Sequence, residues 1–131
     1  MDAVVVHFAD GRTLSGHAEA PSPGAAQFRV REASTGAEVT VALREVKVVC
    51  FVKSLATTGV IRHRESPPLF HPPEGARRVE IVFRDGERMA GTVTEPTPPD
   101  AGFFVTPLNP NGNNRKIYVN PAQVLSFRFV T

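Results

Sequence analysis

Two aspartates occupy matching positions of a repeated motif, and their side chains are the first candidates for chemistry. The nine-residue segments that begin at Phe8 and Phe83 share the pattern F-x-D-G-x-x-(apolar)-x-G, 75 residues apart. Paired carboxylates can serve as general acid and general base. However, Asp-Gly between two apolar runs is also the strongest short-range signal for a β-hairpin, in which glycine takes a positive φ. We therefore interpret four residues as turn formers of two type I′ hairpins rather than as catalysts: Asp10, Gly11, Asp85 and Gly86.

The other reactive residues show no catalytic pattern either. The four histidines lack the spacing of a metal site, and neither a nucleophile-elbow serine nor a glycine-rich loop leading into a helix is present. The only cysteine, Cys50, lies in an apolar run, which predicts an inert, buried thiol. We expect a non-enzymatic protein that needs no cofactor and no metal.

The most polar segment, residues 109–116, is a candidate for binding. A long hairpin loop explains its asparagines and glycine, because both residue types favour turns. The alternative is a site for an anion or for RNA, in which basic side chains and amides contact phosphates or base edges. The residues of this site would be Asn113, Asn114, Arg115 and Lys116. The first copy has Ser34-Thr35-Gly36 at this point, so the site would occur only once.

Two consecutive aromatic residues, Phe103 and Phe104, follow Gly102. Neighbouring residues of a strand point to opposite faces, so only one of the two rings belongs to the core. Phe104 aligns with Phe28 of the first copy and is expected in the core. Phe103 aligns with Gln27 and is expected to be partly exposed or packed on the linker. Packing explains Phe103 better than stacking on a nucleic-acid base.

The excess positive charge lies between the two copies of the motif. Residues 1–52 carry five basic and six acidic side chains, and residues 79–131 carry five of each. Residues 53–78 carry five basic and two acidic side chains, which gives +3. This distribution argues against a general nucleic-acid-binding face, which normally shows a broad basic patch. A solvated surface explains the basic residues, and the alternative is a partner site for an acidic protein, phosphate or nucleotide at Arg62, Arg64, Arg77 and Arg78.

Short apolar runs separated by proline and glycine predict ten strands. We expect them near residues 3–8, 12–19, 26–32, 37–42, 46–52, 78–84, 87–95, 102–106, 115–119 and 123–130. Five short strands that begin with a tight hairpin and a bent second strand are typical of SH3-like and Sm-like barrels. The expected fold is therefore all-β, an internal duplication of two small five-stranded antiparallel barrels packed on each other. The barrels would span residues 1–52 and 78–131, joined by a proline-rich, basic linker at residues 53–77.

The segment Val46–Val52 is apolar on both faces, interrupted only by Lys47. A strand with one wet face should alternate between apolar and polar residues, so the second face needs a covering surface. Units of about fifty residues bury little surface alone, which favours the other copy as the cover. A homodimer contact would explain the same pattern.

Composition places the chain among globular proteins. Hydrophobic residues make up 41%, and no run of eighteen apolar residues and no basic-then-apolar leader occurs. We expect a cytoplasmic protein without membrane contact.

Several segments resemble a family of uncharacterised small bacterial β proteins that are sometimes found beside PilZ domains. The similar segments are Val46–Leu55, the second F-x-D-G-E motif, and Gly102–Pro107 followed by Asn113-Asn114-Arg115. The resemblance implies a bacterial, cytoplasmic protein, and the cyclic di-GMP binding of PilZ domains is not transferred to this chain. A weaker similarity to Sm-like proteins rests on Lys116–Val119 and Val124–Phe127, and it bears on fold rather than function.

These observations lead to two functional hypotheses. The first is a tandem β-barrel module that binds a protein partner, forms a homo-oligomer or assembles regulatory machinery. The second is an Sm-like module that binds RNA or a nucleotide through Arg115, Lys116 and the linker arginines.

Overall fold

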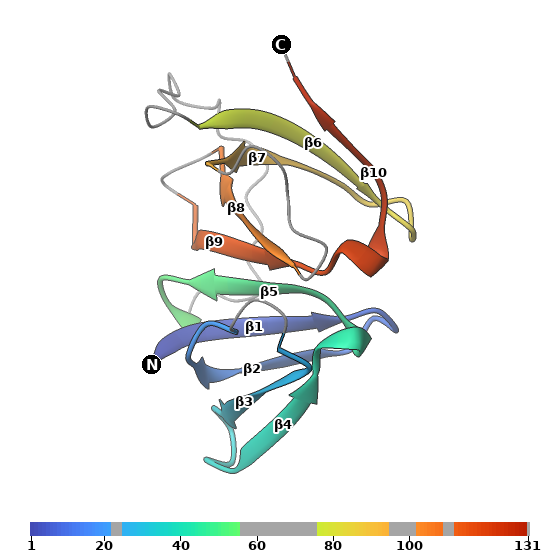
Figure 1. The fold of residues 1–131 in the computed structure, drawn as a ribbon. Helices are drawn as coiled ribbons and strands as arrows, with labels where there is room; N and C mark the ends of the chain where they lie inside the picture. The colour runs from blue at the N-terminus through green and yellow to red at the C-terminus, as the bar shows by residue number, and fades with distance from the viewer. Residues whose placement is uncertain (22–24, 56–75, 95–101, 109–111, 131) are drawn as a thin grey trace.

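Ten strands form one antiparallel sheet in the computed structural model, which describes residues 1–21, 25–55, 76–94, 102–108 and 112–130 (Figure 1). The first half contains β1 (Asp2–Phe8), β2 (Thr13–Ala18), β3 (Gln27–Glu32), β4 (Glu38–Ala42), the 3₁₀ turn η1 (Leu43–Glu45) and β5 (Val46–Val52). The second half contains β6 (Arg77–Phe83), β7 (Arg88–Val93), β8 (Phe103–Pro107), β9 (Asn114–Val119), η3 (Pro121–Gln123) and β10 (Val124–Phe129). Within these residues, no helix is long and apolar enough to cross a membrane.

The two halves have the same internal strand order. It is β5-β1-β2-β3-β4 in the first half and β10-β6-β7-β8-β9 in the second, and pairing of β5 with β9 joins them. Figure 1 shows the halves stacked, with β5 and β9 side by side between them. The all-β class is confirmed, but the strands form one continuous sheet that is not closed, rather than two separate closed barrels.

Strand register corrects the alignment of the two copies. Phe28 pairs with Val41, and Phe103 pairs with Val119, the residue that lies 78 positions after Val41. The counterpart of Phe28 is therefore Phe103, 103 − 28 = 75 residues later, and not Phe104. The expected positions of the two rings were reversed, because a shift of one residue moves a side chain to the other face of a strand. Phe103 is 6% exposed, whereas Phe104 is 37% exposed.

The same registers locate the length difference between the copies. Val30 pairs with Val39, nine residues later, whereas Val105 pairs with Ile117, twelve residues later. The second copy is therefore three residues longer between β8 and β9, where the asparagine-rich segment lies.

The predicted hairpins are present, but their turns are not type I′. A type I′ turn needs positive φ at both central residues. Gly11 and Gly86 have φ of +97° and +92°, and no non-glycine residue described has positive φ. The N–H of Gly86 donates to the carbonyl of Phe83 (2.9 Å), and that of Phe83 donates to the carbonyl of Glu87 (2.8 Å). This is a three-residue loop in which a type I turn is followed by one left-handed glycine.

The β5 strand contributes to both hydrophobic cores. Its side chains Val46, Val49 and Phe51 lie in the core of the first half, together with Val4, Val6 and Val30. The alternate side chains Val48, Cys50 and Val52 lie in the core of the second half, with Ile81, Phe83 and Val105. All seven residues of β5 are buried. The prediction that the other copy covers the second face of this strand is confirmed.

Polar side chains fix the junction between the halves. The amide of Asn120, which follows β9, donates to the carbonyls of Leu43 (3.1 Å) and Val46 (2.8 Å). The ammonium group of Lys47, a residue only 8% exposed, lies 2.8 Å from a carboxylate oxygen of Asp85 and 3.2 Å from one of Glu87. Burying a valine side chain stabilises by roughly 1.5–3 kcal/mol, so the apolar faces of β5 supply most of the energy and the polar contacts fix the register.

Two glycines of the second hairpin should respond differently to substitution. Gly86 has positive φ but open space around it, whereas a Cβ at Gly91 would collide with Val105 and with the backbone of Thr106. Gly86→Ala is expected to cost about 1–2 kcal/mol through backbone strain. Gly91→Ala is expected to cost about 3 kcal/mol, because the neighbouring strand cannot move aside. Urea unfolding of both variants checks this, and an equal loss in the two variants would contradict it.

The Lys47 contacts predict a pH dependence of stability. Hydrogen bonding to Lys47 lowers the pKa of Asp85 from its ordinary value of 3.8. The folded state then holds fewer protons than the unfolded state, so this contribution is present above about pH 4 and is lost as the pH falls further. Lys47→Met removes the main cause of the shift. Its melting temperature should therefore fall less steeply than that of the wild type between about pH 5 and about pH 3. If the melting temperatures of Lys47→Met and the wild type fall equally with pH, the coupling is disproved. Arg12→Met, which removes an exposed partner of Asp10, is the comparison variant.

Candidate functional site

The asparagine-rich segment contributes structural contacts to the junction. The side-chain amide of Asn113 donates to the carbonyl of Ser54 (2.9 Å), and its oxygen accepts the N–H of Ser54 (3.1 Å). Asn114 pairs with Val52 across the junction of β5 and β9. These two asparagines therefore hold the end of β5 in place. Asn113 and Asn114 are both half-buried. The other two asparagines of the segment, Asn109 and Asn111, lie outside the described residues.

Arg115 and Lys116 lie beside the junction but make different contacts. The guanidinium of Arg115 is 2.9 Å from a carboxylate oxygen of Asp2, and this hydrogen bond lowers the pKa of Asp2. The ammonium group of Lys116 lies 4.9 Å from the ring centres of both Phe51 and Phe104. Phe104 is the only ring of this group that is substantially exposed among the described residues. The structure thus brings Lys116 to an exposed aromatic ring, but that ring is not the one expected from sequence.

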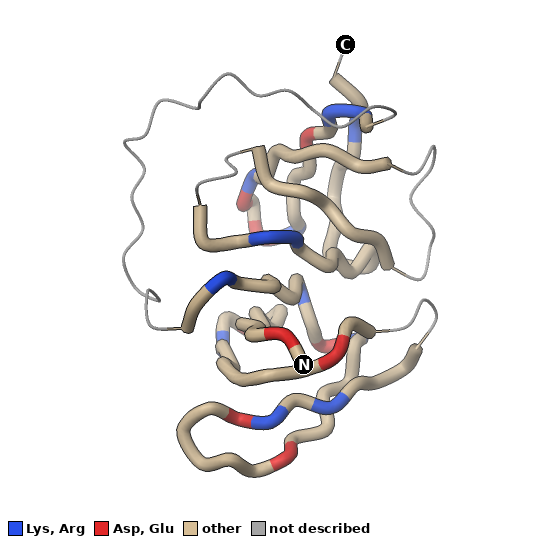
Figure 2. Tube along the Cα trace, turned by 90° about the vertical axis from the view of Figure 1, so that its left-hand side faces the viewer, with Lys and Arg blue, Asp and Glu red and all other residues tan. Residues whose placement is uncertain are grey.

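The linker arginines fall partly outside the description. Arg62 and Arg64 lie outside the described residues. Arg77 and Arg78 begin β6 and are exposed. The guanidinium of Arg77 stacks on the ring of Phe129, 3.8 Å from its centre. In Figure 2 basic segments lie near the C-terminus, and blue and red segments are both scattered over the rest of the described chain.

Three arginines surround one glutamate on the outer face of the second half. Arg128 of β10 is 2.7 Å from a carboxylate oxygen of Glu80, and this hydrogen bond lowers the pKa of Glu80. Arg78 and Arg88 are close enough to stabilise the same carboxylate. No ion pair joins either of them to an acid among the described residues. Three positive charges against one negative charge leave a local excess of +2.

Strand β10 forms an edge of the sheet as far as the chain is described. It pairs with β6 alone, and Leu125 on this strand is 64% exposed. In the first half the corresponding strand, β5, lies between β1 and β9. The edge of β10 is thus equivalent to the edge of β5 that accepts β9. Exposed strand edges are general sites for pairing with another chain.

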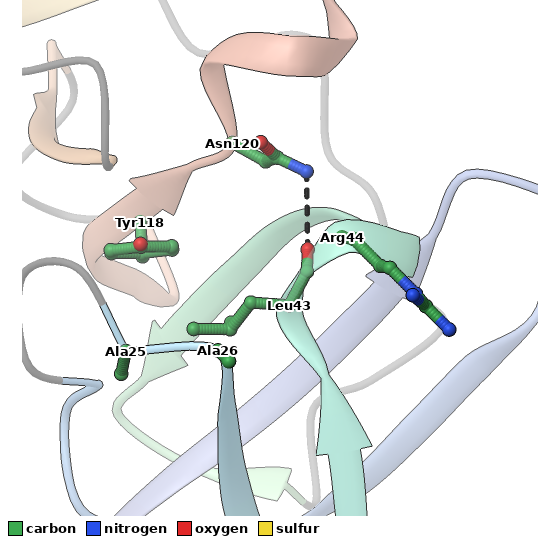
Figure 3. Close-up of a pocket in the computed structure, with 6 residues that line it drawn as sticks. All are labelled: Ala25, Ala26, Leu43, Arg44, Tyr118 and Asn120. Carbon is green, nitrogen blue, oxygen red and sulfur yellow. Dashed lines mark hydrogen bonds between the residues drawn. The ribbon is translucent and has the colours of Figure 1, made fainter.

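A small cleft beside the junction does not add a second site. Its volume is about 240 Å³, below the roughly 300–1,000 Å³ typical of small-molecule sites. Figure 3 shows the Asn120 amide above the cleft, bonded to the carbonyl of Leu43. The oxygen of the same side chain accepts the N–H of Ala122 (3.1 Å), so both ends of the amide are used for structure. The lining residues are Ala25, Ala26, Leu43, Arg44, Tyr118 and Asn120.

The side chains with reactive groups are buried or take part in local hydrogen bonds. Burial raises the pKa of Cys50 to about 12, which makes the thiol unreactive, as its sequence context predicted. Burial also lowers the pKa of His7. The described residues include no group of three histidine, cysteine, aspartate or glutamate side chains that could hold a metal ion. Asp10 and Asp85 lie in separate hairpins, where each accepts the backbone N–H two residues later.

Sequence reasoning missed three residues that the fold makes important. Asn120 forms hydrogen bonds across the junction, and Arg128 pairs with Glu80 in the arginine cluster. Leu125 is exposed on the open edge. Alternation in the sequence places Arg128 on the face opposite Phe127 and Phe129, whereas Leu125 lies at the register irregularity between Val124 and Ser126. It does not reveal that, among the described residues, this strand pairs on one side only.

Comparison with known proteins gives a family but no established activity. No curated protein and no solved structure matched the chain. The sequence model of a family described as "Family of unknown function (DUF6982)" matches residues 1–131, and the chain therefore belongs to this family.

Proposed function

We propose that the protein is a non-enzymatic binding module that recruits a protein partner to the edge of its sheet. The observation that carries this proposal is the open edge of β10, whose counterpart in the first half already accepts a strand. Peptide recognition by strand addition uses such edges, and backbone hydrogen bonds supply part of the affinity. The proposal also fits the environments of Cys50, Asp10 and Asp85, which are buried or bonded within hairpins and do not form a reactive centre.

We further infer that the chain arose by duplication of one SH3-like or Sm-like unit. The identical strand order and the repeated three-residue hairpin loop support this inference. In this view β9 of the second unit covers the free edge of β5 in the first. The equivalent strand of the second unit, β10, keeps its edge available for a partner. A cytoplasmic, bacterial setting fits the single thiol and the balanced surface charge.

Site-specific photo-crosslinking tests the proposed function. Benzoylphenylalanine placed at Leu125, on the open edge, should give one dominant protein adduct in lysate of the native host after irradiation. The same residue at Arg12, an exposed hairpin position of the first half, serves as the control and should give none. The adduct is identified by mass spectrometry and must form again with the purified partner. No adduct at Leu125, or the same adducts at both positions, would refute a partner site on β10.

RNA or nucleotide binding is the second candidate, and Lys116 favours it. Its ammonium group lies against the exposed ring of Phe104, and an aromatic ring beside a cation can stack a base and hold a phosphate. Arg115 adds a second cation, although Asp2 neutralises it locally. The support is narrower than for the open edge, because among the described rings near Lys116 Phe104 alone is exposed and offers one stacking position.

Filter binding of single-stranded RNA tests this second candidate. If it is correct, wild-type protein retains RNA at low salt, and Lys116→Glu combined with Phe104→Ala weakens retention by about tenfold or more. Retention should also fall steeply as salt rises. Arg12→Glu, a charge reversal on the far hairpin, controls for net charge. Absence of retention at low salt, or equal loss in the control, would remove the candidate.

A further inference from the structure

The junction of β5 and β9 shows how this fold accepts an added strand. The N–H of Lys53 donates to the carbonyl of Asn113 (2.8 Å), and the N–H of Asn120 donates to the carbonyl of Lys47 (3.2 Å). Backbone groups alternate in direction along a strand. Val49 and Phe51, which lie between Lys47 and Lys53 at alternate positions, therefore also present their backbone groups to β9.

The equivalent groups of β10 point to the open edge. Phe127 and Phe129 lie 78 residues after Val49 and Phe51. The N–H of Val130 donates to the carbonyl of Arg78 in β6 (2.9 Å). By alternation, the backbone groups of Phe127 and Phe129 face away from β6. They can pair with an added strand in the way that β5 pairs with β9.

A second copy of this chain does not supply a suitable strand. The strand equivalent to β9 is β4, which has Thr40 where β9 has Tyr118 and Ala42 where the junction has Asn120. Tyr118 lies in the core of the first half, and Asn120 bonds two carbonyls there. The free β4 strand has lost both contacts that hold β9 to β5.

The outer face of β10 has changed in the same way. Ser126 and Arg128 stand where β5 has the buried residues Val48 and Cys50. The added strand at this edge therefore cannot bury a second apolar face, as β9 does. It meets instead the arginine cluster of Arg78, Arg88 and Arg128. Together with Glu80, this cluster has a net charge of +2. The guanidinium of Arg77 lies on the inner side instead, where it stacks on Phe129 near the end of the strand.

We propose that the open edge of β10 binds an extended acidic segment of a protein partner as an added antiparallel strand. This proposal rests on the proposed function and names the chemistry of its partner. A residue opposite Arg128 has its side chain on the outer face, where a carboxylate meets the arginines. Residues opposite Phe127 and Phe129 face the inner side, where apolar side chains pack on the two rings. The recognised pattern alternates acidic and apolar residues.

Binding of a synthetic probe to the full chain tests the proposal. The probe is a nine-residue peptide that alternates glutamate with valine, titrated into ¹⁵N-labelled protein. The amide signals of Phe127 and Phe129 should shift, and their hydrogen exchange should slow by about tenfold or more at saturation. A peptide with lysine in place of glutamate should not bind.

Two matched charge reversals locate the contact. Arg128→Glu should weaken binding of the glutamate–valine peptide by about tenfold or more. Arg29→Glu is the control, because Arg29 pairs with Glu38 on the surface of the first half as Arg128 pairs with Glu80. Its affinity for the peptide should stay within about twofold of the wild type. Equal weakening in both variants would overturn the assigned site.

Other outcomes also decide against the proposal. Concentration-dependent shifts at Phe127 and Thr40 without peptide would mean that β4 of a second copy occupies the edge. Retention of single-stranded RNA that Arg128→Glu abolishes, with no peptide binding, would assign the arginines to nucleic acid. If the peptide fails but the Leu125 crosslink is formed, this inference is wrong and the proposed function stands. If the crosslink is also absent, both are wrong.

Discussion

Burial of both faces of one strand is the interaction on which this structure depends. A unit of about fifty residues buries little apolar surface and is marginally stable alone, and each half of this chain has about that size. The β5 strand solves the problem by giving Phe51 and its neighbours to one core and Cys50 and its neighbours to the other. The halves are therefore joined by a shared element, and neither core is complete without it. This constraint explains why the segment has no polar face.

The junction also accounts for the differences between the two halves. Tyr118 and Asn120 hold β9 to the first half, and Lys47 holds β5 to the β6–β7 hairpin. Their counterparts in the other half are Thr40, Ala42 and Leu125. An edge strand that kept the apolar residues of β5 would expose an apolar surface prone to aggregation. Proteins avoid such aggregation by placing charged residues on edge strands. The copies thus share a scaffold, and their differences separate the joining surface from the free surface. The proposed binding role is assigned to the free surface because the joining surface is already occupied.

Local pattern predicted the elements well but not the details of pairing. All ten strands and both hairpins follow from apolar runs and from glycine at Gly11 and Gly86. The turn type was wrong because one left-handed glycine after a type I turn meets the same need with less strain on the aspartate. Phe103 and Phe104 were exchanged because the alignment placed one of the three extra residues of the second half before Phe104, whereas strand pairing places all three between β8 and β9. Asn120 gave no signal, since its partners, Leu43 and Val46, lie more than seventy residues away.

The sequence by itself determined the strand content, the duplication of the hairpin motif and the need for a cover over the second face of Val46–Val52. These properties depend on local backbone preference and on the alternation of apolar residues, which a linear chain displays directly. Only the tertiary structure decided which strand provides the cover, which ring is exposed and which strands lie at the edges of the described sheet. Those features depend on contacts between residues far apart in the chain, because hydrogen bonding between strands and burial are satisfied jointly in three dimensions. The arginines around Glu80 form one charged surface for the same reason: β6, β7 and β10 each contribute one, and only sheet pairing places them together.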